Sequence, residues 1–177
     1  MSESPPLDRP RSVLFVCLGN ICRSPLAEGV FLHLARERGA TARYRVDSAG
    51  TGAWHVGEPP DPRSAEVAQR HGLRLEGSAR QVRSEDLKEF DLILAMDSEN
   101  LRAMEHLGAG RTIAANIALL RDYDPNSDGD RDVPDPYYGG TDGFERVFHL
   151  IRRSCAALLN VLEERPSAGD TSDRRSS

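Results

Sequence analysis

Residues 13–25 read Val-Leu-Phe-Val-Cys-Leu-Gly-Asn-Ile-Cys-Arg-Ser-Pro. The first four are apolar and mostly β-branched or aromatic, which is typical of a strand buried on both faces. Small and polar residues follow at once. Ser24 and Pro25 are then a residue type that caps helices and the residue favoured at the first helical position. The segment therefore predicts a buried strand, a tight loop and a helix.

Outward from this segment, apolar runs alternate with segments of helical period. Further strands are predicted at residues 44–48 and 92–96, with a weaker one within 113–120. The last helix has the clearest period, and Asp142 is its predicted N-cap. Such alternation predicts an α/β fold with a mostly parallel sheet covered by helices on both faces. Ligands of these folds bind beyond the carboxyl ends of the strands, which is where the first strand delivers Cys17.

The chain is predicted to form one domain, residues 12–165, between two disordered tails. Residues 1–11 hold three prolines and few apolar residues, and residues 166–177 are mostly polar. The formal net charge of -5 argues against nucleic acid or an anionic membrane as a partner. No apolar run resembles a secretory signal or a membrane span, and three cysteines are too few for a disulfide framework. A cytoplasmic protein is expected.

The loop between the first strand and the first helix has the residue types of a phosphate site that contains a nucleophile. A tight loop can point its N–H groups inward, and the helix adds its positive end. Gly19 and Asn20 tolerate the left-handed backbone that such a loop needs. These donors favour the thiolate of Cys17, while Arg23 can bind two phosphoryl oxygens at once. Ser24 can donate to the sulfur when it leaves. The pattern predicts phosphoryl transfer through a cysteine.

These residues resemble the signature loop of the low-molecular-weight protein tyrosine phosphatases. The resemblance spans about residues 13–162 and rests on segments 15–25, 47–51, 79–81, 96–97 and 135–139. Residues 54–57 look most like the actinobacterial members. The resemblance implies a single domain with a four-stranded parallel sheet flanked by helices. It also implies hydrolysis of phosphotyrosine in proteins through a cysteinyl-phosphate intermediate, inhibition by phosphate or vanadate, and no cofactor.

Residue types and resemblance together predict the site. Cys17 is the nucleophile and Arg23 the phosphate clamp, and Asp135, between two prolines, matches the general acid of the family. The other predicted substrate- or phosphate-binding residues are Leu18, Gly19, Asn20, Ile21, Cys22, Ser24, Ser48, Trp54, Tyr137 and Tyr138. Among these, the three aromatic residues are predicted to flank the substrate ring. A histidine that the family often carries near the loop asparagine falls at Gly77, and His71 is an unassigned substitute.

The acidic stretch 124–135 leaves two alternatives open. It follows the spacing of a calcium-binding EF-hand loop, but with Asp at the twelfth position and prolines at the second and eleventh, so a solvated loop is preferred. Asp132 and Asp128 in the same stretch compete with Asp135 for the role of general acid. No histidine has metal-ligand spacing with another ligand, so no metal is predicted.

Other functions remain as alternatives. An arsenate reductase needs further cysteines, and the one farther downstream, Cys155, is predicted to be buried in the last helix. A protein-arginine phosphatase would resemble this loop but carries Thr where this chain has Ile21. A catalytically silent phosphate-binding module is the third. Cys22 either captures an oxidised Cys17 as a disulfide or merely fills the loop.

Overall fold

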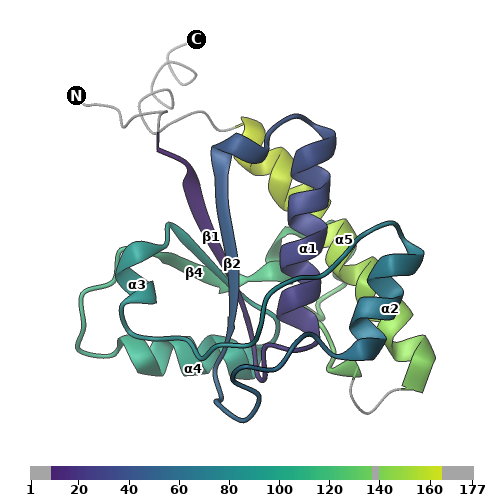
Figure 1. The fold of residues 1–177 in the computed structure, drawn as a ribbon. Coiled ribbons are helices and arrows are strands. Elements are labelled where there is room, and N and C mark those ends of the chain that lie inside the picture. The colour runs from purple at the N-terminus through teal and green to yellow at the C-terminus, as the bar shows by residue number, and fades with distance from the viewer. Residues whose placement is uncertain (1–8, 137–139, 165–177) are drawn as a thin grey trace.

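A parallel sheet in the strand order β2-β1-β3-β4 forms the centre of the structure, a computed structural model that describes residues 9–136 and 140–164 (Figure 1). The strands are β1 (Arg11–Cys17), β2 (Tyr44–Gly50), β3 (Leu92–Ala95) and β4 (Asn116–Leu119). All three pairings are parallel, with Phe15 of β1 between Ser48 and Leu94. The predicted four-stranded parallel sheet is confirmed.

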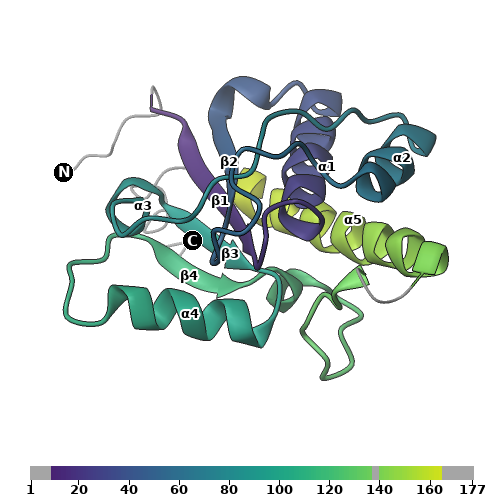
Figure 2. The same ribbon diagram turned by 60° about the horizontal axis from the view of Figure 1, so that its bottom comes forward.

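Helices cover both faces of the sheet (Figures 1 and 2). One face carries α1 (Arg23–Glu37), α2 (Pro62–Arg70) and α5 (Gly140–Glu164), and the other carries α3 (Asp86–Glu89) and α4 (Ser98–Gly108). Two 3-10 turns, η1 (Thr41–Arg43) and η2 (Leu120–Tyr123), precede β2 and follow β4. Among residues 9–136 and 140–164, no helix has both the length and the apolar character needed to cross a membrane.

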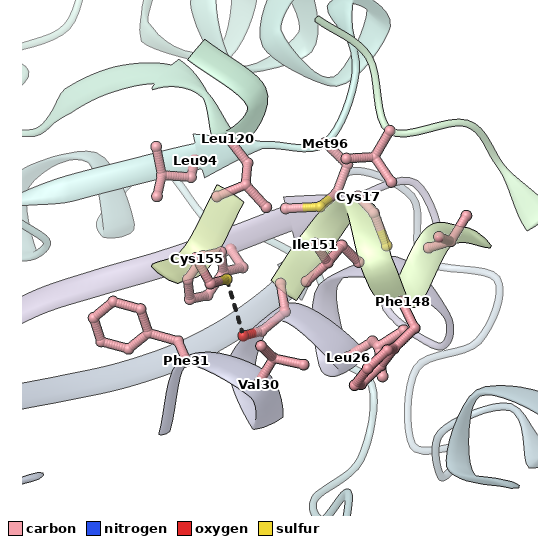
Figure 3. Close-up of a cluster of buried hydrophobic side chains, with 14 of the residues drawn as sticks. Cys17, Leu26, Val30, Phe31, Leu94, Met96, Leu120, Phe148, Ile151 and Cys155 are labelled. Atoms are coloured by element: carbon pink, nitrogen blue, oxygen red, sulfur yellow. Dashed lines mark hydrogen bonds between the residues drawn. The ribbon is translucent and has the colours of Figure 1, made fainter. Parts of the chain in front are cut away.

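The central strand β1 is apolar from Val13 to Cys17 because this part of it faces a packed layer on each side. Phe15 and Cys17 contribute to the cluster under α1 and α5, while Leu14 and Val16 contribute to the cluster under α3 and α4. Figure 3 shows part of the first cluster, where the Cys155 thiol points toward the backbone oxygen of Ala27 at 3.9 Å. Cys155 is fully buried, as predicted, so it is part of the core.

The first strand and the last helix begin at other residues than predicted. Strand β1 begins at Arg11, which was assigned to the tail; its guanidinium donates to the backbone oxygen of Leu162 at 2.9 Å. Arg9 also forms an ion pair with Asp91 at 3.0 Å. The last helix, α5, begins at Gly140, so Asp142 lies within its first turn and is not the predicted N-cap. Residues 1–8 and 165–177 lie outside the described part of the chain.

Candidate active site

The phosphate-binding loop, residues 17–24, joins the end of β1 to the first turn of α1. Its left-handed residue is Asn20, with φ of 59°, whereas Gly19 has no positive φ. A Cβ at position 19 would lie 3.0 Å from Cδ2 of His55, so any larger residue there would require the His55 side chain to shift. The Asn20 amide donates to the hydroxyls of Ser24 at 2.8 Å and Ser48 at 3.0 Å, and its oxygen accepts from the Arg80 N–H at 2.9 Å. Asn20 therefore holds the loop to β2 and to the segment before α3.

The sulfur of Cys17 lies inside this loop and is almost fully buried. It accepts the backbone N–H of Asn20 at 3.3 Å, and the Ser24 hydroxyl lies 3.1 Å away. Ser24 is not the helix cap that was predicted, since α1 begins at Arg23 with Cys22 as its N-cap. The physical reason is that the serine hydroxyl is already engaged by Asn20 and the Cys17 sulfur. The Asn20 N–H and the Ser24 hydroxyl therefore both face the sulfur.

Arg23 is held rigidly although it carries a charge and is only 3% exposed. Its Nη1 donates to the Asp97 carboxylate at 2.7 Å and to the Val133 backbone oxygen at 2.9 Å. The second carboxylate oxygen of Asp97 caps α4 by accepting the Asn100 N–H at 2.8 Å. No role was predicted for Asp97, although its position two residues after the end of β3, at the carboxyl edge of the sheet, was a usable signal.

A pocket of about 210 Å³ opens over the loop. It is lined by Cys17, Leu18, Gly19, Ile21, Cys22, Arg23, Trp54, His55 and Asp135. Asp135 reaches the rim with its carboxylate 3.8 Å from Arg23 Nη2. Trp54 is 72% exposed and lies against Gly52, so it is a wall of the pocket and not a core anchor. His55 forms a second wall of the pocket, and no role was predicted for it. The predicted residues Tyr137 and Tyr138 lie outside the described residues.

Two carboxylates of the acidic stretch before Asp135 accept hydrogen bonds, one from two arginines and the other from the first residue of α4. Asp124 accepts from Arg153 at 2.7 and 2.9 Å and from Arg121 at 3.1 Å. The Arg153 hydrogen bonds are the main reason that the pKa of Asp124 falls to about 2. Asp132 accepts from the N–H and hydroxyl of Ser98 at the start of α4. Both groups therefore have structural partners, and neither lines the pocket.

A chain of hydrogen bonds connects Glu28 of α1 to the phosphate-binding loop. Its carboxylate accepts the Ser48 hydroxyl at 2.7 Å, and Ser48 in turn accepts from Asn20, which contacts Ser24 beside the sulfur. Burial raises the pKa of Glu28 from 4.5 to about 7; nearby Asp47 adds to the rise, while the Ser48 hydrogen bond opposes it. The chain of contacts links the protonation of Glu28 to the loop.

Two residues considered near the loop have other surroundings. His71 does not replace the family histidine, because its ring bonds to Glu145 at 2.6 Å. Gly77 lines a small cavity together with Asn20 and Glu28.

Burial raises the pKa of Cys22 to about 12, and the negative charges of Asp61 and Cys17 raise it further. Cys22 thus ionises poorly, and its protective role stays a prediction.

Glu28→Gln is expected to change stability in a pH-dependent way. The folded chain holds the Glu28 proton more tightly than the unfolded chain, so this stabilisation is complete below about pH 4.5 and is lost as the pH rises through about 7. Glutamine keeps an acceptor for Ser48 without the buried charge. The variant should therefore be more stable than the wild type at pH 8, by at most about 3 kcal/mol, and similar at pH 5. Thermal unfolding at both pH values, with the exposed Glu105→Gln as control, measures this. An equal response of the two variants would contradict it.

Comparison with known proteins places this geometry in a family. A profile described as low molecular weight phosphotyrosine protein phosphatase matches residues 12–168. A low molecular weight protein-tyrosine-phosphatase of Streptomyces coelicolor is 46% identical over 153 residues, which are 86% of this chain and 93% of that protein. The crystal structure of YfkJ from Bacillus subtilis has a TM-score of 0.82 at 44% identity, covering 88% of this chain and 96% of that one. The structure of a Drosophila arginine phosphatase has a TM-score of 0.80 at 37% identity, and the match covers 85% of this chain and 97% of that one. The chain therefore belongs to the low molecular weight phosphotyrosine protein phosphatase family and is a protein-tyrosine phosphatase.

Proposed function

We propose that this chain hydrolyses phosphotyrosine in proteins through a cysteinyl-phosphate intermediate. Cys17 is the nucleophile, Arg23 the phosphate clamp and Asp135 the general acid and base. The observation that carries the proposal is one pocket lined by all three groups, which come from the loop and from the segment before α5. The buried guanidinium supports a dianionic ligand here, because its fork is held in place by Asp97 and Val133 before any phosphate binds.

In the first step the Cys17 thiolate attacks phosphorus and the bond to the tyrosyl oxygen breaks. Asp135, at the rim of the pocket, donates its proton to that oxygen, so tyrosine leaves neutral. The charge on the phosphoryl oxygens is stabilised by Arg23 and by the N–H groups of the loop.

In the second step water attacks the phosphorus of the cysteinyl phosphate. Asp135, now a carboxylate, takes the proton of the water, and the bond between sulfur and phosphorus breaks. The Ser24 hydroxyl and the Asn20 N–H, 3.1 and 3.3 Å from the sulfur, stabilise the departing thiolate. Inorganic phosphate is released and the enzyme returns to its starting state.

Trp54→Ala tests how the pocket selects an aromatic substrate. The indole lines the pocket together with Cys17, where its face can stack on the tyrosyl ring of a substrate. Its removal should raise KM about tenfold for aryl phosphates, equivalent to about 1.4 kcal/mol, and much less for a small alkyl phosphate. Val56→Ala, in the same loop but outside the pocket lining, is the matched control. Equal changes for both substrates would make Trp54 a purely structural residue.

The phosphate-binding loop and Arg23 lead to one expectation about inhibitors, and the thiol of Cys17 leads to another about the cellular compartment. Phosphate and vanadate should inhibit competitively, because both present oxygens to the donors that hold the phosphoryl group. A nucleophilic thiol also needs a reducing compartment to stay active, which supports a cytoplasmic location.

A preference for phosphoarginine is the second candidate, favoured by the likeness to the Drosophila arginine phosphatase. Ile21 lines the pocket with an apolar side chain that crowds a guanidinium group. We therefore expect kcat/KM for a phosphotyrosine peptide to exceed that for phosphoarginine, and Ile21→Thr to narrow the difference. Steady-state assays of the wild type and of Ile21→Thr with a phosphotyrosine peptide, phosphoarginine and arsenate measure this difference in kcat/KM. A higher kcat/KM for phosphoarginine in the wild type would overturn the assignment of phosphotyrosine.

A further inference from the structure

A second cluster of ligand-type side chains lies where the end of α2 meets α5. His71 is the C-cap of α2, and Glu145 and His149 stand one turn apart on α5. The Nε2 atoms of His71 and His149 lie 2.6 and 3.1 Å from the same oxygen, Oε2 of Glu145. One ligand atom from each residue lies within 4.8 Å of the others, and none of the three lines the catalytic pocket. The fold thus brings three ligand-type side chains together, whereas no histidine was predicted to have metal-ligand spacing with another ligand.

Two of these three side chains are held in place by their surroundings. The imidazole of His71 stacks on the buried ring of Phe148, with centroids 4.0 Å apart and an interplanar angle of 13°. The other carboxylate oxygen of Glu145 accepts from Arg70 at 3.0 Å, which leaves Oε2 directed at both imidazoles. Partners that orient ligands in this way are characteristic of metal sites in proteins.

We propose that His71, Glu145 and His149 bind a divalent first-row transition metal ion, with Zn²⁺ as the best match. Two imidazole nitrogens and one carboxylate oxygen are a ligand set that zinc accepts, with water as the fourth ligand. Bond lengths of about 2.0–2.2 Å place tetrahedral ligand atoms about 3.3 Å apart. In the structure the three ligand atoms lie within 4.8 Å of one another. Because the His149 side chain is exposed, it can move its ring nitrogen to the spacing that a bound ion requires.

Such an ion would link α2 to α5 and act on stability, not on phosphoryl transfer. The two helices already pack together, and Arg63 of α2 lies over the ring of Phe144 of α5 at 4.6 Å. The positive charge of Arg70 beside Glu145 opposes the ion, so we expect an affinity in the micromolar range and not that of a closed structural zinc site.

The test uses the full chain with Cys17→Ser, which keeps the metal away from the catalytic sulfur. Calorimetric titration with ZnCl₂ should show one site, and saturation should raise Tm by a few degrees. Adding His149→Gln should weaken binding at least about tenfold and remove the shift. His149 is exposed, so the variant should fold. Glu145→Gln, which can still accept from Arg70, should act in the same direction.

The matched control is His33→Gln, also made in the Cys17→Ser background. The His33 ring lies 3.2 Å from the Glu37 carboxylate, one turn away on α1, so this pair has the same spacing as Glu145 and His149. Among the described residues, no third metal-ligand side chain joins this pair. This control should bind Zn²⁺ like its parent. Co²⁺ bound to the parent should give visible bands of a nitrogen- and oxygen-ligated ion, absent after His149→Gln. No saturable binding up to about 1 mM Zn²⁺, or equal binding in the His149 and His33 variants, would overturn the proposal.

Discussion

Cys17→Ser is expected to abolish turnover while phosphate and vanadate still bind. A serine hydroxyl is a far weaker nucleophile than a cysteine thiolate near neutral pH, so attack on phosphorus should be lost. Arg23 and the backbone of the loop, which hold the oxyanion, are unchanged by the substitution. We expect kcat to fall by about 10⁴-fold or more, as for the loss of a covalent nucleophile in other enzymes. Steady-state turnover of a phosphotyrosine peptide and calorimetry with vanadate measure the two properties separately.

The control for this variant is Cys155→Ala. Cys155 is buried in the cluster of α1 and α5, and it does not line the pocket. Its truncation removes core contacts, so it should lower Tm while the folded fraction keeps its turnover. A Cys17→Ser protein that retains more than a few per cent of the wild-type kcat would rule out Cys17 as the nucleophile.

Asp135→Asn is expected to cost about 10²–10⁴-fold in kcat/KM on substrates with a basic leaving group. The asparagine has the size and shape of the aspartate but supplies no proton to the departing oxygen. A nitrophenolate needs no such proton, so nitrophenyl phosphate should lose far less when phosphorylation of the enzyme is the step observed. The loss should therefore grow with the basicity of the leaving group, which a series of aryl phosphates measures.

Asp132→Asn separates a chemical effect of Asp135 from a structural effect of the acidic stretch. The Asp132 carboxylate accepts from Ser98 at the start of α4, and an asparagine oxygen can do the same. We expect no dependence on the leaving group in this variant. If Asp132 carried that dependence and Asp135 did not, the assignment of the general acid would be wrong, while the roles of Cys17 and Arg23 would be unaffected.

The fold class and the family were predictable because their signals are local. The apolar run of β1 predicted a strand buried on both faces, and the structure has it at the centre of the sheet. Cys17 and Arg23 are six positions apart in one loop, so their proximity follows from the loop itself. Predicted boundaries were less accurate at Ser24 and Asp142. Both residue types favour helix caps, but one hydroxyl is used by the sulfur and the other residue lies inside α5.

The amino-acid sequence by itself thus determined the strand and the loop, and it predicted the nucleophile with its clamp, because short-range sterics and backbone hydrogen bonding act within one segment. The tertiary structure alone decided which distant side chains complete the site. Asp97 reaches Arg23 only because β1 and β3 are neighbours whose carboxyl ends meet. Glu28 and Ser48 meet because α1 packs over β2, and His71 meets Glu145 because α2 packs on α5. Such contacts depend on how elements pack across the core, and no local residue pattern encodes that packing.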